Sequence, residues 1–436
     1  MATFNDELWC VTQGIDETDY TLRGGWGIVP SGNLFFSRTL DAKCWSWNTA
    51  IGQISGAEPM STARPVATAF TPASGSQLLY VFWPAASGHL QYVTTDGTYT
   101  TPTSSAYGLP WSGPYQVGSA AYTDDNAAAA VMPPLDSPAD PDQLHVFWQG
   151  SNHSGYLYYA TMSPAGDWSS PSQIVPTGCE GAYMSLSPSV VSYAPGGGTP
   201  TTYVFYQKNG SSGKQQDKVD LQYCAYAGGT WTQSQVPNIS YTTPAIEGLT
   251  QETYTGIDAA TPPAAIVFNG KLYVFYAQDT YQWSETGKSW ANLYPVTYSV
   301  FDGTTWSDPN RIGSTSTANA TSLPYEYSQV PQFVSAAILN EELYVFFMNV
   351  GAASAECPPP GGIYYVSTSD GTHWSSLVPT TNVIYVPGGT TSLEDDLGTE
   401  VNDSLAAING ALSYVGLPTS DEIRNNVATG VIGVFF

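Results

Sequence analysis

The chain has 436 residues, of which 42% are hydrophobic and only 11% charged, against roughly 25% charged in an average domain. Because 36 acidic residues outnumber 11 basic ones, the net charge is −25, which repels phosphate and makes nucleic acid and anionic membranes poor partners. No run of 18 apolar residues occurs and "MATFNDELWC" lacks the features of a secretory signal, so we expect no signal peptide, no membrane insertion and a soluble protein, cytoplasmic or released by a non-classical route.

The first patterned segment is residues 34–47, "LFFSRTLDAKCWSW", which matches the second half of a unit that is complete further along the chain. Five units follow, each built around a strand such as "KLYVFYAQDT" (271–280). The second core position of that strand is Tyr80, His145, Tyr203, Tyr273 and Tyr344, and a weaker sixth copy places Ser413 there. By subtraction the intervals are 65, 58, 70, 71 and 69 residues, longer than the roughly 40–50 of common propeller blades, so we expect longer loops.

Each unit runs through four strands in the same order. The first ends in a small turn, and Asn269–Gly270 is a strong two-residue hairpin signal. The second strand follows, then a variable loop and a third strand such as 295–301. A turn and an aromatic residue, as in 302–306, open the fourth, so each unit is one antiparallel meander.

The repeat predicts an all-β protein: a single β-propeller domain over residues 1–436 with six four-stranded blades. Residues 403–417 supply only the first half of a unit. We therefore expect the N- and C-terminal strands to share one blade and close the ring. A seventh blade stays open if residues 31–36 form a separate strand, and an array of β-sandwiches is the alternative fold.

Two sets of aromatic and amide side chains are candidates for ligand contacts. An aromatic at the third-to-fourth turn can wedge neighbouring blades together or stack on a sugar ring, once per blade. Aromatics and amides at the end of the second strand suit ligand contacts or solvated loops. The turn set is Trp45, Tyr99, Trp168, Trp231, Trp306 and Trp374, and the strand-end set is Trp83, Trp148, Gln149, Tyr206, Gln207 and Tyr276.

No catalytic or metal-binding motif stands out. The turns at Asp302 and Asp370 read as Asp-Gly β-turns, and the five arginines occupy no equivalent repeat positions. Five dispersed cysteines form no C-x-x-C pair, which leaves one or two disulfides open. The acidic run 392–403, with Asp395 and Asp396, is read as a solvated loop, with calcium as the weaker alternative and no other cofactor expected.

The repeat resembles the six-bladed fungal fucose-binding lectins of the Aleuria type, best seen in "YVFYQ" and "LQYCAYAGGTW" between residues 203 and 231. The resemblance implies the ring and the turn aromatics at Trp168, Trp231, Trp306 and Trp374, with Tyr99 as a substitute. In that family an arginine on the second strand and a glutamate on the third hold fucose. Here the arginine slot holds tyrosine or histidine and the glutamate is missing, so fucose specificity does not carry over.

These patterns predict a non-catalytic, multivalent carbohydrate-binding protein whose partners are glycans or glycoproteins, with a homodimer left open. A propeller glycoside hydrolase or sialidase-like enzyme is one alternative, because 36 acids offer many carboxylate pairs. A protein-interaction or toxin-associated scaffold is the other.

Overall fold

A computed structural model of the protein describes residues 1–16, 29–42, 49–51, 61, 64–73, 75–98, 110–123, 127–137, 140–151, 156–174, 187–208, 220–237, 240–242, 253–255, 261–277, 280–284, 289–293, 296–312, 334–349, 362–376 and 378–379. A first compact unit comprises residues 1–14 and 30–385, and a second comprises 15–29 and 386–436, of which residues 15, 16 and 29 are described. That the whole chain is one domain stays a prediction. No helix of the described part is long and apolar enough to cross a membrane.

The described chain forms six four-stranded antiparallel sheets, which we call blades one to six in chain order. Blades one to three are β1 (Ala2–Phe4), β2 (Glu7–Asp16), β3 (Val29–Thr39) and β4 (Thr49–Ala50); β5 (Val66–Phe70), β6 (Leu78–Pro84), β7 (Leu90–Thr95) and β8 (Ser112–Gln116); and β9 (Ala127–Met132), β10 (Gln143–Gln149), β11 (Leu157–Met162) and β12 (Ser172–Gln173).

Blades four to six are β13 (Ser189–Tyr193), β14 (Thr201–Lys208), β15 (Asp220–Ala227) and β16 (Thr230–Gln235); β19 (Ala264–Phe268), β20 (Lys271–Ala277), β23 (Val296–Phe301) and β24 (Asn310–Arg311); and β25 (Val334–Leu339), β26 (Glu342–Asn349), β27 (Gly362–Thr368) and β28 (Val378–Pro379). Two further hairpins, β17 (Ser240–Thr242) with β18 (Thr253–Thr255) and β21 (Thr280–Ser284) with β22 (Ser289–Leu293), form separate two-stranded sheets. The described residues contain one short 3₁₀ turn, η2 (Pro195–Gly197).

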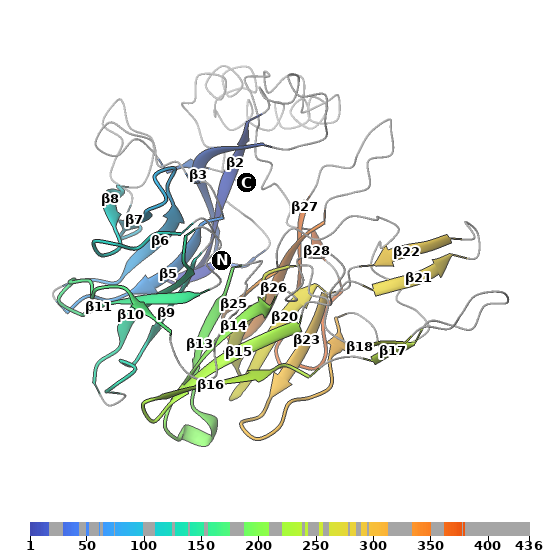
Figure 1. The fold of residues 1–436 in the computed structure, drawn as a ribbon. Coiled ribbons are helices and arrows are strands. Elements are labelled where there is room, and N and C mark those ends of the chain that lie inside the picture. The colour runs from blue at the N-terminus through green and yellow to red at the C-terminus, as the bar shows by residue number, and fades with distance from the viewer. Residues whose placement is uncertain are drawn as a thin grey trace, which may run out of the picture. The chain divides into compact units, whose positions relative to one another are not determined.

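The first strands of the blades form a closed ring of neighbours. Strand β1 contacts β5, β5 contacts β9, β9 contacts β13, β13 contacts β19, β19 contacts β25, and β25 returns to β1 (Figure 1). The predicted six-bladed propeller is therefore confirmed.

The predicted closure needs a correction. In the described residues blade one takes all four of its strands from the first 50 residues rather than sharing them with the C-terminal segment, and the ring closes where β1 meets β25. The physical reason is the hairpin at Asn5 and Asp6, whose φ angles of 51° and 59° reverse the chain between Phe4 and Glu7. Residues 403–417, expected to share that blade, lie outside the described residues.

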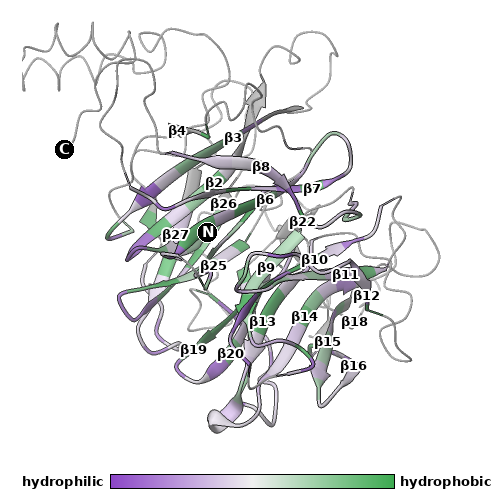
Figure 2. Ribbon diagram, turned by 90° about the vertical axis from the view of Figure 1, so that its left-hand side faces the viewer, coloured by the Kyte–Doolittle hydropathy of each residue, from purple (hydrophilic) through white to green (hydrophobic). Residues whose placement is uncertain are grey.

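The core lies between the blades rather than within one layer. Six clusters of buried side chains are found in the described residues, one at each of the six blade interfaces. Each second strand is buried over most of its length because both of its faces meet a neighbouring blade. Figure 2 shows hydrophobic residues along these strands and hydrophilic ones in the turns that join them.

The antiparallel order gives the ring two different ends. One, the turn end, carries the short hairpins between first and second strands and the turns between third and fourth strands. The other, the loop end, carries the connections between second and third strands and those between blades. Residues at the ends of the second strands, named above as candidates, lie at the loop end.

Candidate ligand-binding surface

The aromatics at the ends of the second strands are core residues. Trp83, Tyr206 and Tyr276 are 0% exposed and Trp148 is 1% exposed. Burial raises the pKa of Tyr206 to about 12, although a hydrogen bond from Gln233 partly offsets this rise. The amides that follow are almost as buried, with Gln149 at 2% and Gln207 at 4%. In this structure these side chains have next to no surface to offer a ligand, and they pack blades together.

The turn aromatics form a repeated wedge at three interfaces. In each, a tryptophan from one blade meets a phenylalanine of the preceding blade edge to face and also packs against a tyrosine of that blade. The phenylalanine–tryptophan ring centroids are 6.1, 6.0 and 5.8 Å apart, with interplanar angles of 84°, 89° and 89°. The three sets are Phe82, Tyr92 and Trp168; Phe205, Tyr223 and Trp306; and Phe275, Tyr298 and Trp374.

These wedge tryptophans keep part of their surface. Trp168, Trp306 and Trp374 are half-buried, and the indole N–H groups of Trp306 and Trp374 donate to Tyr223 and Tyr298 at 3.4 and 3.3 Å. Trp231 differs, because it is 8% exposed and its ring packs, tilted by 59°, against Tyr226 of its own blade with centroids 5.0 Å apart. Trp45 and Tyr99 lie outside the described residues.

The slot that the resemblance assigns to arginine is filled by buried, uncharged rings. Its occupants are between 0% and 8% exposed, and burial raises the pKa of Tyr80 and of Tyr203 to about 12. In each blade that has this slot, its ring stacks on the phenylalanine two residues further along the strand, with ring centroids 6.1–6.3 Å apart. The occupants are Tyr80, His145, Tyr203, Tyr273 and Tyr344.

Blade one has a charged pair that the sequence reasoning missed. The Arg38 guanidinium lies 2.8 Å from the Glu7 carboxylate and 5.4 Å from the Trp9 ring centroid. Both charged side chains are largely buried, 19% and 17% exposed. Trp9 is itself 0% exposed, so this pair holds the blade face in place and leaves no indole face for a ligand.

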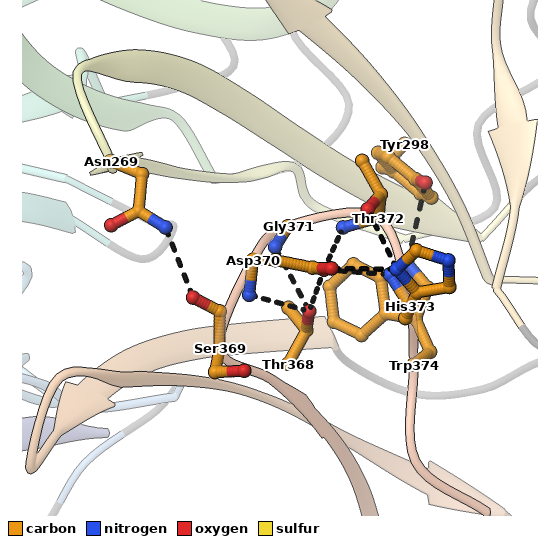
Figure 3. A network of polar contacts seen from close by, with 9 residues as sticks. All are labelled: Asn269, Tyr298, Thr368, Ser369, Asp370, Gly371, Thr372, His373 and Trp374. Atoms are coloured by element: carbon orange, nitrogen blue, oxygen red, sulfur yellow. Dashed lines mark hydrogen bonds and ion pairs between the residues drawn. The ribbon is translucent and has the colours of Figure 1, made fainter.

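The Asp-Gly turns are structural, as their sequences indicated. In blade six, Asp370 accepts hydrogen bonds from the backbone N–H groups of Thr372 and His373, both at 2.8 Å (Figure 3). These bonds hold the pKa of the Asp370 carboxyl well below its usual range. The Asn269 amide of blade five donates to the Ser369 carbonyl at 3.1 Å, so the network ties two blades together (Figure 3).

An accessible aromatic site lies at the loop end of blade two. Tyr122 is 42% exposed, and its ring centroid lies 4.1 Å from that of His89. The Nδ1 atom of His89 is 2.7 Å from the side-chain nitrogen of Gln116. We call His89, Gln116 and Tyr122 the blade-two cluster. It offers one exposed ring beside an imidazole and an amide.

Backbone hydrogen bonds position the blade-two cluster. Thr123 donates to the Gly88 carbonyl at 2.8 Å, and Leu90 donates to the Ala121 carbonyl at 2.9 Å. Gly88 takes φ of 78°, which lets the short turn after β6 place His89 against Tyr122. The sequence reasoning missed this cluster because its members are far apart in the chain and do not repeat from blade to blade.

No group of three or more His, Cys, Asp or Glu in the described part of the chain is placed to hold a metal ion. Asp395 and Asp396, the weak calcium candidates, lie outside that part. Cys10 is a free, buried thiol and Cys224 is disulfide-bonded, so one of the bridges that the spacing left open is present.

No protein-family model and no curated protein matches this chain. Among solved structures, it is similar to the Aleuria aurantia lectin in complex with Fucα1-6GlcNAc, at 16% identity over 82% of this chain and 92% of that chain, with a TM-score of 0.45. AofleA from Arthrobotrys oligospora matches at 11% identity over 86% and 89%, with a TM-score of 0.43. The GH93 α-L-arabinofuranosidase of Fusarium graminearum matches at 13% identity over 58% and 65%, with a TM-score of 0.38. Neither a ligand nor a binding residue passes from these proteins to this chain, whose fold rests on the sheets described above.

Proposed function

We propose that this propeller binds carbohydrate without altering it chemically, and that the blade-two cluster is one of its saccharide contacts. The observation that carries the proposal is the exposed Tyr122 ring, whose centroid lies 4.1 Å from that of His89, which in turn contacts Gln116. A pyranose has one face rich in C–H groups, which packs on an aromatic ring, and hydroxyls around its rim. The rim hydroxyls would pair with the imidazole and the amide.

A second set of contacts would make the binding multivalent. The half-buried Trp168, Trp306 and Trp374 repeat around the ring with nearly the same ring geometry, and each keeps part of its indole at the surface. A glycan or glycoprotein carrying several sugars would engage more than one such position, and avidity would then exceed single-site affinity.

The test begins with the full chain on a glycan array, followed by calorimetry with the best saccharide. Tyr122→Ala removes the stacking face, so we expect at least about a tenfold loss of affinity, the equivalent of roughly 1.4 kcal/mol. The matched control is Tyr156→Ala, because Tyr156 is also exposed, at 47%, and lies on the neighbouring blade. It should bind as the unmodified chain does.

Two results would contradict the proposal. One is the absence of binding to any glycan, and the other is undiminished binding by Tyr122→Ala. Turnover of chromogenic glycosides, abolished by a single Asp or Glu change, would favour the glycoside hydrolase instead.

A further inference from the structure

The fourth strands form the outer edges of the six blades, and most of them are short or interrupted. In the described residues β4, β12, β24 and β28 are two residues long. Strand β8 has five residues, but it contains Pro114 and its register shifts opposite Tyr92 and Thr94. Such short, proline-bearing or irregular edges keep foreign strands from adding to a sheet.

Strand β16 lacks these protections. It has six residues, each paired in unbroken register with β15, and it contains no proline. Residues 228–237, "GGTWTQSQVP", carry no charge, in a chain whose net charge is −25. A second copy approaching this edge meets no like charges there, whereas most of the acidic surface repels it.

The turn before β16 determines which of its backbone groups point outward. Gly228 and Gly229 have φ of 57° and 84° and form a two-residue turn. In such a hairpin the flanking residues, Ala227 and Thr230, are a hydrogen-bonded pair, and bonding alternates from there. The backbone groups of Trp231 and Gln233 therefore point away from β15, toward the edge.

This edge is complementary to itself. A two-fold axis through Gln233 places Gln233 opposite its own copy, with outward backbone groups facing outward backbone groups. The same axis sets Thr232 opposite Ser234 of the second copy, a neutral hydroxyl pair, and both side chains are exposed. The side chain of Gln233 is held in the sheet by Tyr206 at 2.5 Å and by Gln222, so it is already ordered.

We propose that β16 is a homodimerisation edge, along which a second copy of this chain adds antiparallel to make one continuous eight-stranded sheet. This goes beyond carbohydrate binding and does not depend on it. If both hold, a dimer doubles the number of sugar contacts per particle.

The test uses sedimentation equilibrium of the full chain over a wide concentration range. The variants are Thr232→Lys/Ser234→Lys and Thr232→Glu/Ser234→Glu, which place like charges opposite each other across the two-fold axis. We expect the unmodified chain to move from the mass of one chain to that of two as concentration rises. Each variant alone should stay at the mass of one chain, and an equimolar mixture should recover the mass of two.

The matched control is Ser112→Lys/Ser119→Lys, which adds the same charge at and beside β8. It should dimerise as the unmodified chain does, and circular dichroism should show all variants folded. The proposal is overturned if the unmodified chain keeps the mass of one chain at every concentration, or if either charged variant dimerises alone. Calorimetry with sugar separates this result from the proposed function, because affinity per chain should not change in the β16 variants.

Discussion

A single buried slot on the second strand shows what burial does to different side chains. His145 occupies it in blade three, is 0% exposed, and has its pKa lowered to about 4 because desolvation penalises the imidazolium. Tyr203 occupies it in blade four, and the same desolvation raises its pKa to about 12. Both shifts keep the side chain neutral, so the slot requires an uncharged ring rather than a tyrosine as such.

His145 should make the protein sensitive to acid. Unfolded, the imidazole takes up a proton near pH 6.5, whereas folded it does so only near pH 4. The stability that this difference contributes is complete above about pH 6.5 and is lost as pH falls toward 4, amounting to roughly 3 kcal/mol. Urea unfolding of His145→Tyr, the residue of the sister blades, should show a smaller loss over that range than the unmodified chain. Equal losses in both proteins would contradict this account.

Only some features of the candidate site could be predicted from the sequence. The repeat identified Trp83 and Trp148 as equivalent, but alternation alone does not tell whether a strand-end aromatic meets solvent or the next blade. In a propeller both faces of a second strand are covered, so both are buried. His89 and Tyr122 come together only because two non-repeating turns dock through backbone hydrogen bonds, and no local pattern encodes that.

At the scale of elements, the turn end is a collar in which each blade touches the next. The hairpin between the first and second strands of one blade packs against the turn between the third and fourth strands of the following blade. A Cβ added to Gly97 would come within 2.8 Å of Phe4, and one added to Gly303 within 2.3 Å of Pro195. These turns are therefore spaced by contact as well as by their own backbone preferences.

A substitution at Gly371 would test the contact between neighbouring blades at the turn end. Gly371 has φ of 78°, and a Cβ there would lie 2.0 Å from the Tyr273 hydroxyl, whose side chain is 2% exposed and has little room to move. We expect Gly371→Ala to lower the free energy of unfolding by about 2–4 kcal/mol, from backbone strain and overpacking together. Gly166→Ala is the control, because φ is 93° but nothing lies within 4 Å, so only about 1 kcal/mol of strain applies. Equal effects in chemical denaturation would show that the contact does not matter.

The sequence predicted the order of strands in five blades but assigned blade one wrongly. Strand β1 has only three residues, too few for alternation to stand out. The informative signal was the turn: "FNDEL" at Phe4 matches "FNGKL" at Phe268 and "LNEEL" at Leu339. In all three copies the asparagine takes positive φ, at Asn5, Asn269 and Asn340.

At the scale of the whole molecule, stability is distributed over six blade interfaces, each with its own buried cluster. Each buried cluster belongs to two blades, so no blade has a core of its own. The ring is completed by β1, where the Thr3 hydroxyl donates to the Ile338 carbonyl of blade six at 2.6 Å. Loss of one interface should therefore lower the stability of the whole ring.

Phe4→Ala tests this coupling. Phe4 is 1% exposed, meets Trp9 edge to face with ring centroids 5.7 Å apart, and lies against Gly97 of blade two. Removing a buried phenylalanine costs about 3–5 kcal/mol, and in a closed ring the loss should lower the single unfolding transition as a whole. Calorimetry together with tryptophan fluorescence would check this. Two separate transitions, with blade one melting first, would contradict the coupling.

The contrast between the two ends of the ring has a consequence for how such a chain can change. At the turn end several connections lie tightly against a neighbouring blade, as Gly97, Gly303 and Gly371 show, so an inserted residue at these turns would collide with that blade. At the loop end the connections vary in length, from the few residues between β6 and β7 to the stretch between β20 and β23 that holds a hairpin of its own. New specificities, whether acquired by mutation or grafted by design, are thus accommodated most readily in the connections of the loop end.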